Sequence, residues 1–254
     1  MITRRRFLRD GSVFSAAFSV GRKAHLQLAQ AGKGVYRNPI MAGDHPDGSP
    51  IRVGDDFYLT HSSFDYAPGL LIWHSRDLIN WRPVGAALHR YYGTVWAPYL
   101  CEYEGHYYIY FPADNRIRVV HADHPIGPWS EPVDLGITAI DPAHVSENGR
   151  RFLYVSGGQM AELTADGLAV KSAPRAVFEA WPIPATTRIE CICLEAPKIL
   201  QRNGYFYLNV AEGGQPVRLR AIPSSVRVAA ARKARGSSPP ITPWCTPHHA
   251  KIAG

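Results

Sequence analysis

One layout occurs four times between residues 47 and 208, and it constrains the fold more than any other feature of the sequence. Each copy has a short motif, a few apolar residues, a tight turn that contains glycine, and an aromatic-rich segment. Such turns between alternating aromatic and β-branched residues predict β-hairpins. The four turns are Gly54-Asp55-Asp56, Glu104-Gly105, Asn148-Gly149 and Asn203-Gly204.

The copies recur at about 40–55 residues, which is typical of the blades of a β-propeller, where each four-stranded sheet packs against its neighbours. Two copies also share a matching outer half that ends in tryptophan, Trp81 in one and Trp129 in the other. The sequence therefore predicts an all-β propeller domain over residues 32–214.

Three carboxylates occupy equivalent positions in the repeat, just before the first strand of a copy: Asp47, Asp141 and Glu195. Innermost strands of a propeller begin near its central axis, so these side chains are expected to converge. Convergent carboxylates repel one another, which raises at least one pKa and points to acid–base chemistry. The alternative for Asp47 and Asp141 is a structural role in a turn.

The formal charge of +7 is carried by the two ends of the chain. Residues 215–254 contain seven basic residues and no acidic one, and residues 1–31 have a net charge of +5, which leaves −5 for the 183 residues between them. The predicted domain is therefore mildly acidic, unlike a nucleic-acid-binding surface. We expect neither nucleic acid nor a membrane as a partner.

The four cysteines do not form the pattern of a disulfide framework or of a tetrahedral metal site. Cys191 and Cys193 would lie on one face of a strand. We interpret them as small core residues, with a metal role as the alternative. No metal site is predicted.

The N-terminus has paired arginines at Arg4, Arg5 and Arg6, a short apolar run from Ser12 to Val20, and Ala29-Gln30-Ala31. This resembles a twin-arginine export signal over residues 1–31, and it predicts a periplasmic or secreted protein. The alternative is a basic tail, because Arg22 and Lys23 interrupt the apolar stretch.

Five motifs, taken together, resemble glycoside hydrolase family 43, which contains β-xylosidases, α-L-arabinofuranosidases and arabinanases. Their joint order and spacing carry the resemblance, which extends over roughly residues 37–214. The motifs are Gly43-Asp44-His45-Pro46-Asp47-Gly48-Ser49, residues 64–78, Trp96-Ala97-Pro98, Ile140-Asp141-Pro142 and Glu195-Ala196-Pro197.

The resemblance implies a five-bladed β-propeller and an inverting mechanism. Asp47 matches the general base that activates water, with Asp44 as its nearest competitor. Glu195 matches the general acid, and Asp141 matches the carboxylate that keeps the acid protonated and oriented. An inverting pair stands about 6.5–9.5 Å apart to admit water, which suits carboxylates on different blades.

Phe64 and Trp96 match aromatic positions of the family's sugar-binding subsite, where flat apolar rings suit a sugar face. Trp73 and His74 are weaker substrate-binding candidates from the same motif as Phe64. For Trp96 the alternative is a core position. No cofactor is expected beyond a structural calcium ion in the propeller channel.

The chain departs from the family pattern at two places. Gly48-Ser49-Pro50 follows Asp47 where the family has Pro-Ser-Ile, and Gly48 is expected to loosen the backbone of the base. Tyr99 stands where an acidic residue is common. Neither change removes a predicted catalytic carboxylate.

Beyond residue 214 the aromatic segments stop, and a basic stretch rich in Ala, Arg, Pro and Ser follows. We expect residues 215–254 to be a disordered tail that does not belong to the fold, so that the last blade is incomplete. A frameshift would explain it, because back-translating residues 240–247 two bases later permits Asn-Pro-Leu-Val-His. A divergent natural tail is the alternative.

The sequence thus predicts a glycosidase that hydrolyses xylosidic or arabinofuranosidic bonds of plant cell-wall polysaccharide or oligosaccharides with inversion. The alternatives are an inactive propeller remnant and a propeller that binds carbohydrate without chemistry.

Overall fold

The structure is a computed structural model that describes residues 36–180, 191–202, 205–213 and 225–232. Within these ranges the regular elements are strands and no helix occurs. The predicted all-β class is therefore confirmed. A helix long and apolar enough to cross a membrane is likewise absent from the described part of the chain.

Each of four sheets is built from strands that follow one another in the sequence. The first sheet contains β1 (Ser49–Val53), β2 (Asp56–Thr60), β3 (Gly69–Ser75) and β4 (Arg82–Leu88). The second contains β5 (Tyr99–Tyr103), β6 (His106–Ala113), β7 (Arg116–Ala122) and β8 (Val133–Thr138).

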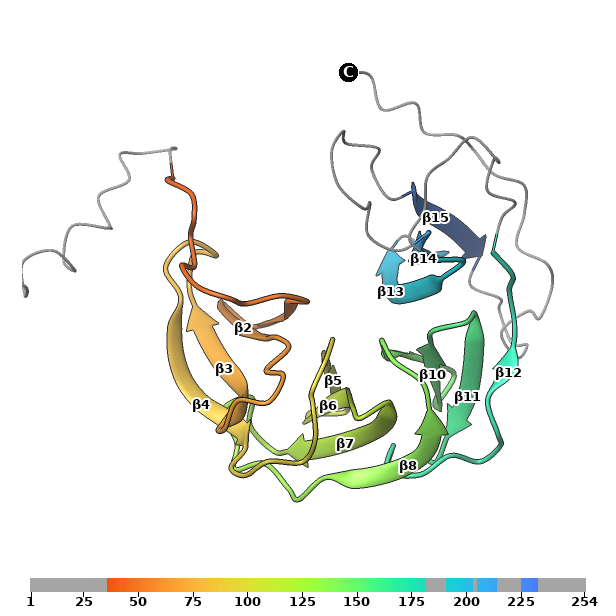
Figure 1. The fold of residues 1–254 in the computed structure, drawn as a ribbon, viewed down its shortest axis with the longest axis horizontal. Coiled ribbons are helices and arrows are strands. Elements are labelled where there is room, and N and C mark those ends of the chain that lie inside the picture. The colour runs from red at the N-terminus through yellow and green to blue at the C-terminus, as the bar shows by residue number, and fades with distance from the viewer. Residues whose placement is uncertain (1–35, 181–190, 203–204, 214–224, 233–254) are drawn as a thin grey trace, which may run out of the picture.

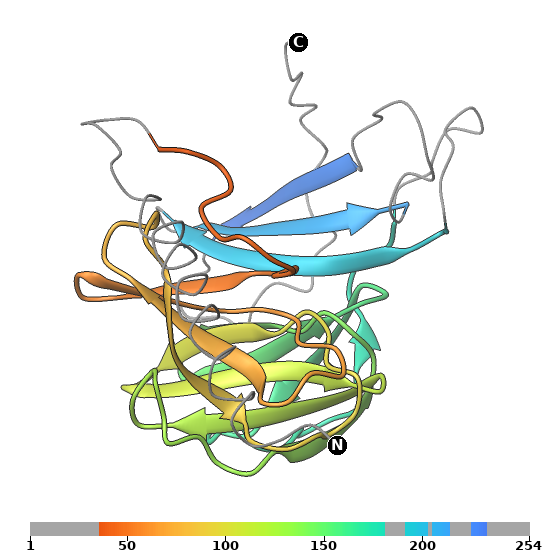
Figure 2. The ribbon, with the colours of Figure 1, turned by 60° about the vertical axis from the view of Figure 1, so that its left-hand side comes forward.

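The third sheet contains β9 (Ala143–Glu147), β10 (Arg150–Val155), β11 (Gln159–Leu163) and β12 (Arg175–Ala176). The fourth contains β13 (Leu194–Arg202), β14 (Tyr205–Glu212) and β15 (Ser225–Arg232), which lie side by side in Figure 2. All sheet neighbours are antiparallel, so each sheet is a meander.

The four sheets form an arc around a common centre (Figure 1). Their first strands face inwards, and β5 contacts both β1 and β9, while β9 also contacts β13. Within the described residues the arc does not close between the first sheet and the fourth. The propeller-like arrangement of sheets is thus present, and the count of five blades stays a prediction.

The predicted hairpin turns connect the first two strands of a sheet wherever the turn is described. Glu104-Gly105 and Asn148-Gly149 have φ values of +52° and +82°, and +52° and +74°. Two successive residues with positive φ make a type I′ turn, whose twist matches that of the flanking strands. The fourth predicted turn, Asn203-Gly204, lies outside the described residues.

A separate apolar cluster fills each boundary between neighbouring sheets. Ile72 and Ile109 belong to the cluster between the first and second sheets. Tyr110 and Leu153 join the second sheet to the third, and Ile199 of β13 packs on the cluster of the third sheet. Burial of these side chains supplies most of the cohesion between sheets.

Arg151 on β10 is a buried cation at the boundary of the second and third sheets, 1% exposed. Its guanidinium lies 4.3 Å from the ring centre of Tyr103 and 4.1 Å from that of Tyr108. It donates to His144 Nε2 at 3.1 Å and to the Tyr110 hydroxyl at 3.0 Å. Aromatic faces and neutral acceptors therefore stabilise its charge.

The predicted basic tail contains β15, which pairs with β14 along its whole length, from Ser225 opposite Glu212 to Arg232 opposite Tyr205. These eight residues extend the fourth sheet by one strand. The proposed boundary at residue 214 and the frameshift stay predictions. The predicted export signal, residues 1–31, lies outside the described residues.

Candidate active site

Asp47 lies two residues before β1, in the left-handed backbone region with φ +57°, where Asp is found more often than most residues with a side chain. Its Oδ2 accepts a hydrogen bond from Ser62 Oγ at 2.5 Å. The Ser62 amide also donates to the Pro46 carbonyl at 3.1 Å. Because Ser62 is buried and Asp47 is exposed, the Asp47 carboxylate is held by a buried hydroxyl on one side and is open to water on the other.

Asp141 holds the equivalent position two residues before β9, and its φ of +56° is nearly the same. It is 9% exposed, and its Oδ2 accepts a hydrogen bond from the Ala196 amide at 2.8 Å. Burial raises the pKa of Asp141, and the charge of Asp47 acts in the same direction. The repeat therefore places two like carboxylates within electrostatic reach of each other.

Glu195 is half-buried and is the second residue of β13, so it lies inside a strand and not before one. The register with β14 shifts between Glu195 and Lys198, and Ala196 has φ +51°. Such a bulge turns the backbone out of the ladder. At this bulge the Ala196 amide donates to Asp141. Asp141 is therefore hydrogen-bonded to the residue that follows Glu195.

Lys198 on β13 was not among the residues predicted from the sequence. Burial lowers its pKa, while the charges of Asp141 and Asp47 raise it. Its ammonium lies 5.2 Å from the ring centre of Tyr99. The positive charge of Lys198 therefore acts on both aspartates. A lysine within the apolar segment 197–200 is the sequence signal that could have identified it.

Ser62 was also missed, because nothing distinguishes it from its neighbours in the sequence. The adjacent His61 extends the support of Asp47, since its Nδ1 lies 2.7 Å from the Ser62 carbonyl and its Nε2 3.1 Å from His45 Nδ1. His45 Nε2 lies 3.2 Å from the Ala42 carbonyl. Burial lowers the pKa of His61, which favours its neutral ring.

Phe64 and Trp96 are brought together by the backbone. Phe64 forms an antiparallel bridge with Val95, the residue before Trp96, through hydrogen bonds of 2.8 and 3.0 Å in the two directions. Both rings are half-buried. The partial exposure leaves apolar surface on each residue, and the subsite role stays a prediction.

Trp73 and His74 point to different surroundings. The Trp73 ring lies 5.0 Å from that of His45 in an edge contact, so Trp73 packs against the pair His45 and His61, which supports Asp47. His74 does not join the carboxylates. Its Nε2 lies 2.6 Å from Asp56 Oδ1, and Asp56 begins β2 opposite Val53, at the end of β1 that is farther from Asp47.

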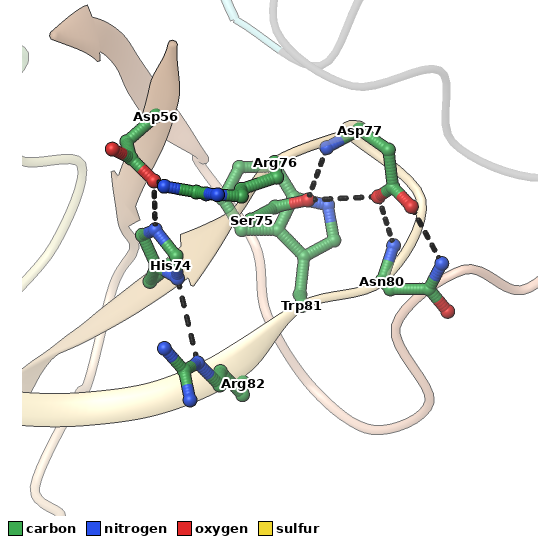
Figure 3. Close-up of a pocket in the computed structure, with 8 residues that line it drawn as sticks. All are labelled: Asp56, His74, Ser75, Arg76, Asp77, Asn80, Trp81 and Arg82. Carbon is green, nitrogen blue, oxygen red and sulfur yellow. Dashed lines mark hydrogen bonds and ion pairs between the residues drawn. The ribbon is translucent and has the colours of Figure 1, made fainter. Parts of the chain in front are cut away.

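His74 instead lines an open pocket of about 620 Å³ on the first sheet (Figure 3). Arg82 Nε donates to its Nδ1 at 3.4 Å, so Nε2 carries the proton and donates to Asp56. Asp77, also in this pocket, caps the turn before Trp81 through the amides of Ile79 and Asn80. These hydrogen bonds stabilise the hairpin between β3 and β4.

Cys191 and Cys193 are joined by a disulfide and are half-buried. The interpretation of both as core residues is therefore wrong at this pair, because a bend at Ile192 brings their Cα atoms to 5.2 Å, within the range of a disulfide. Cys101, in contrast, is a free thiol in the core between the second and third sheets. The sulfurs of the pair and a Glu195 oxygen lie within 4.8 Å of one another.

The structural calcium ion expected in the channel stays a prediction. Ca²⁺ takes six to eight oxygen ligands. The metal-ligand cluster found among the described residues contains two sulfurs, which calcium does not use.

Comparisons with known proteins give a consistent set of relatives. A family model described as Glycosyl hydrolases family 43 matches residues 36–248. A xylan 1,3-beta-xylosidase of Vibrio sp is 36% identical over 211 residues, and BoGH43B of Bacteroides ovatus, a non-reducing end alpha-L-arabinofuranosidase, is 32% identical over 207 residues. These matches cover 70% and 75% of this chain and 38% of each relative.

Solved structures agree with these matches. The GH43 BlXynB protein of Bacillus licheniformis has a TM-score of 0.69 at 26% identity, with 84% of this chain and 43% of that chain covered. The Bacteroides ovatus Xyloglucan PUL GH43B structure has a TM-score of 0.65 at 29% identity, with 84% and 42% covered. The chain therefore spans less than half the length of the relatives it resembles.

Proposed function

Because this chain belongs to glycosyl hydrolases family 43, we propose that it is a glycosidase that cleaves xylosidic or arabinofuranosidic bonds with inversion of configuration. The observation that carries the proposal is the linked set of carboxylates. Asp47 and Asp141 hold equivalent positions before two inner strands, and Asp141 accepts the amide next to Glu195 on a third.

In this mechanism Asp47 is the general base. It has to be anionic and oriented, and its hydrogen bond from Ser62 supports both requirements. Its exposed side leaves room for the water that attacks the anomeric carbon. The proton of that water passes to Asp47 as the new carbon–oxygen bond forms.

Glu195 is the general acid, which protonates the leaving oxygen on the opposite side of the sugar. Asp141 does not touch the reacting atoms in this proposal and acts as a positioning residue. Its carboxylate holds the Ala196 amide at 2.8 Å, which fixes the backbone from which Glu195 projects. Its negative charge also disfavours early proton loss from a neighbouring acid.

The substrate in this proposal is a xylose- or arabinose-containing oligosaccharide or polysaccharide. Two relatives are named for a xylosidase and an arabinofuranosidase activity, which supports both sugars as candidates. Phe64 and Trp96, adjacent through the Phe64–Val95 bridge, would provide the apolar surface against which the ring stacks. The five-bladed ring and export from the cytoplasm are part of the same proposal.

The test is hydrolysis of aryl β-xyloside and aryl α-L-arabinofuranoside by the full chain. We expect turnover of at least one of them, and we expect Glu195→Ala and Asp47→Asn to lower kcat by about 10²-fold or more. An NMR spectrum of the first product anomer should show inversion.

Well-folded protein without turnover on either substrate would contradict the proposal. If Asp47→Asn then left sugar affinity unchanged, the result would favour a propeller that binds carbohydrate without chemistry. A retained anomer with normal activity would reject only the inverting assignment.

A further inference from the structure

Cys191, Cys193 and Glu195 alternate along the chain, and the backbone bends at Ile192, between the two cysteines. The Cα atoms of the two cysteines are 5.2 Å apart and a disulfide joins their sulfurs. Both sulfurs and a carboxylate oxygen of Glu195 fall within 4.8 Å of one another.

The backbone of this segment is held independently of the disulfide. The Leu194 carbonyl accepts a hydrogen bond from the Gly157 amide at 2.6 Å, and the Cys193 carbonyl accepts one from the Gly213 amide at 3.1 Å. Opening the sulfur–sulfur bond therefore leaves Cys193 and Leu194, the two residues directly before Glu195, held to the rest of the structure by these bonds.

We propose that reduction of the Cys191–Cys193 disulfide creates a binding site for a thiophilic divalent cation of the Zn²⁺ or Cd²⁺ type, with two thiolates and the Glu195 carboxylate as ligands. A phosphine breaks the sulfur–sulfur bond, water supplies the oxygen of the phosphine oxide, and two protons go to the sulfurs. The cation then displaces both protons as two metal–sulfur bonds form.

The donor set selects the class of cation. Zinc binds thiolate sulfur at about 2.3 Å and carboxylate oxygen at about 2.0–2.2 Å in tetrahedral sites. Ligand atoms within 4.8 Å of one another reach such a geometry through side-chain rotation. Two sulfurs disfavour Mg²⁺ and Ca²⁺, which prefer oxygen ligands. Three protein ligands leave the fourth position to water.

A cation bound there would remove Glu195 from the hydrolytic reaction. This consequence rests on the proposed role of Glu195 as the general acid, whereas cation binding itself does not. The site would then make hydrolysis sensitive to zinc in the reduced protein and insensitive in the oxidised protein.

The experiment is a Cd²⁺ titration of the phosphine-reduced full chain. It uses the Cys245→Ser variant as the background protein, because Cys245 lies outside the described residues. Cys101 is buried in the core, and burial raises the pKa of its thiol to about 12. We expect one equivalent of Cd²⁺ to produce the near-ultraviolet thiolate-to-metal absorption band, and Zn²⁺ to abolish it by competition.

Four comparisons with the reduced background protein locate the site. Untreated protein, Cys191→Ser and Cys193→Ser should lack the one-equivalent band, while Glu195→Gln should retain the band with affinity lowered about tenfold or more. Circular dichroism spectra establish that each variant is folded. Cys101→Ser is the matched control and should bind as the background protein does.

The proposal is overturned if the reduced protein shows no band, if either cysteine variant binds like the background protein, or if Glu195→Gln leaves the affinity unchanged. Failure of the glycosidase assay does not alter these readouts, so the two proposals fail separately. In an active preparation, Zn²⁺ should inhibit only the reduced protein.

Discussion

Lys198 is the residue on which the charge balance of the candidate site depends. Burial opposes its positive charge, and Asp141 and Asp47 favour it. The reverse also holds, since Lys198 lowers the pKa of Asp141 against the effect of burial. The ammonium thus favours the ionised form of Asp141, which burial disfavours.

We therefore predict that Lys198→Met shifts the acidic limb of the pH profile of kcat/KM to higher pH, by about one to three pH units. The reason is that a carboxylate without its cationic neighbour binds a proton more readily. Activity at mildly acidic pH should fall more than activity at neutral pH.

Lys198→Arg keeps the charge and is the matched control, with a smaller displacement of the limb. A uniform loss of activity at every pH in Lys198→Met would contradict the electrostatic role and indicate a packing role on Tyr99 instead.

The positions of Asp47 and Asp141 could be predicted because each stands two residues before the first strand of its sheet, whereas Glu195 lies inside β13. The structure bears out equivalent backbone positions for the two aspartates, with φ near +57° in both. Lys198 and Ser62 could not be predicted in this way. Their roles depend on side-chain contacts across the chain, such as the bond from Ser62 to Asp47, which leave no periodic pattern.

At the scale of elements, the bulge in β13 shapes the site. It separates the Glu195–Ala211 pair from the ladder that resumes at Lys198. Between them Ala196 adopts φ +51° and donates its amide to Asp141. A residue with a side chain pays about 1–2 kcal/mol for this conformation, so the strand is strained at the residue that follows Glu195.

Ala196→Val should destabilise the protein by about 1–3 kcal/mol, because a β-branched residue tolerates a positive φ poorly. Ala196→Gly relieves the same strain and keeps the amide, so we expect stability within about 1 kcal/mol of the natural chain and activity within about twofold. Urea unfolding midpoints and kcat/KM measure both effects. Equal stability of the two variants would argue against backbone strain at this bulge.

The hairpins were predictable element by element because their turns are local. Glu104-Gly105 and Asn148-Gly149 each take two consecutive positive φ values, which these residue pairs favour. The bulge was not predictable, because Ala196-Pro197 within an apolar segment gives no glycine signal. Its conformation is fixed by the distant Asp141 carboxylate.

At the scale of the whole molecule, the boundary between the second and third sheets contains the buried Arg151 cluster. His144 lies on this boundary, 7% exposed and stacked 5.6 Å from the Tyr110 ring. Burial lowers the pKa of His144 to about 3, and the charge of Arg151 adds to the effect. Nε2 of the neutral imidazole accepts a hydrogen bond from Arg151 Nε, so protonation of His144 would break this contact.

Stability should therefore decline as the pH falls from about 6.5, the unfolded pKa of histidine, towards about 3, the folded value. The unfolded chain binds one more proton than the native state across this window, which contributes up to about 1.4 kcal/mol per pH unit. His144→Gln keeps a neutral acceptor for Arg151 and should flatten the decline. Urea unfolding between about pH 4 and pH 7 measures it, and an unchanged slope in the variant would contradict the assignment.

Sequence patterns predict the sheets, but they do not predict the buried cation at the boundary between the second and third sheets. Arginine is almost never fully buried, and Arg151 in the alternating strand 150–155 looks like a solvent-facing residue. Its burial follows from Tyr103 and Tyr108 of another sheet, which lie on its guanidinium. Whether the sheets close into a ring could not be predicted from the sequence for a related reason, since ring closure depends on how sheets that are distant in the sequence meet.

The inner carboxylates come from different sheets, Asp47 from the first, Asp141 from the third and Glu195 from the fourth. In the proposed mechanism, a sugar held between Asp47 and Glu195 would link the first sheet to the fourth without a covalent bond, because it would bind only the assembled state. Thermodynamic linkage would then raise the free energy of unfolding by about 2.7 kcal/mol when the free ligand is at 100 times its Kd. Under that proposal the protein would resist unfolding most while a sugar is bound.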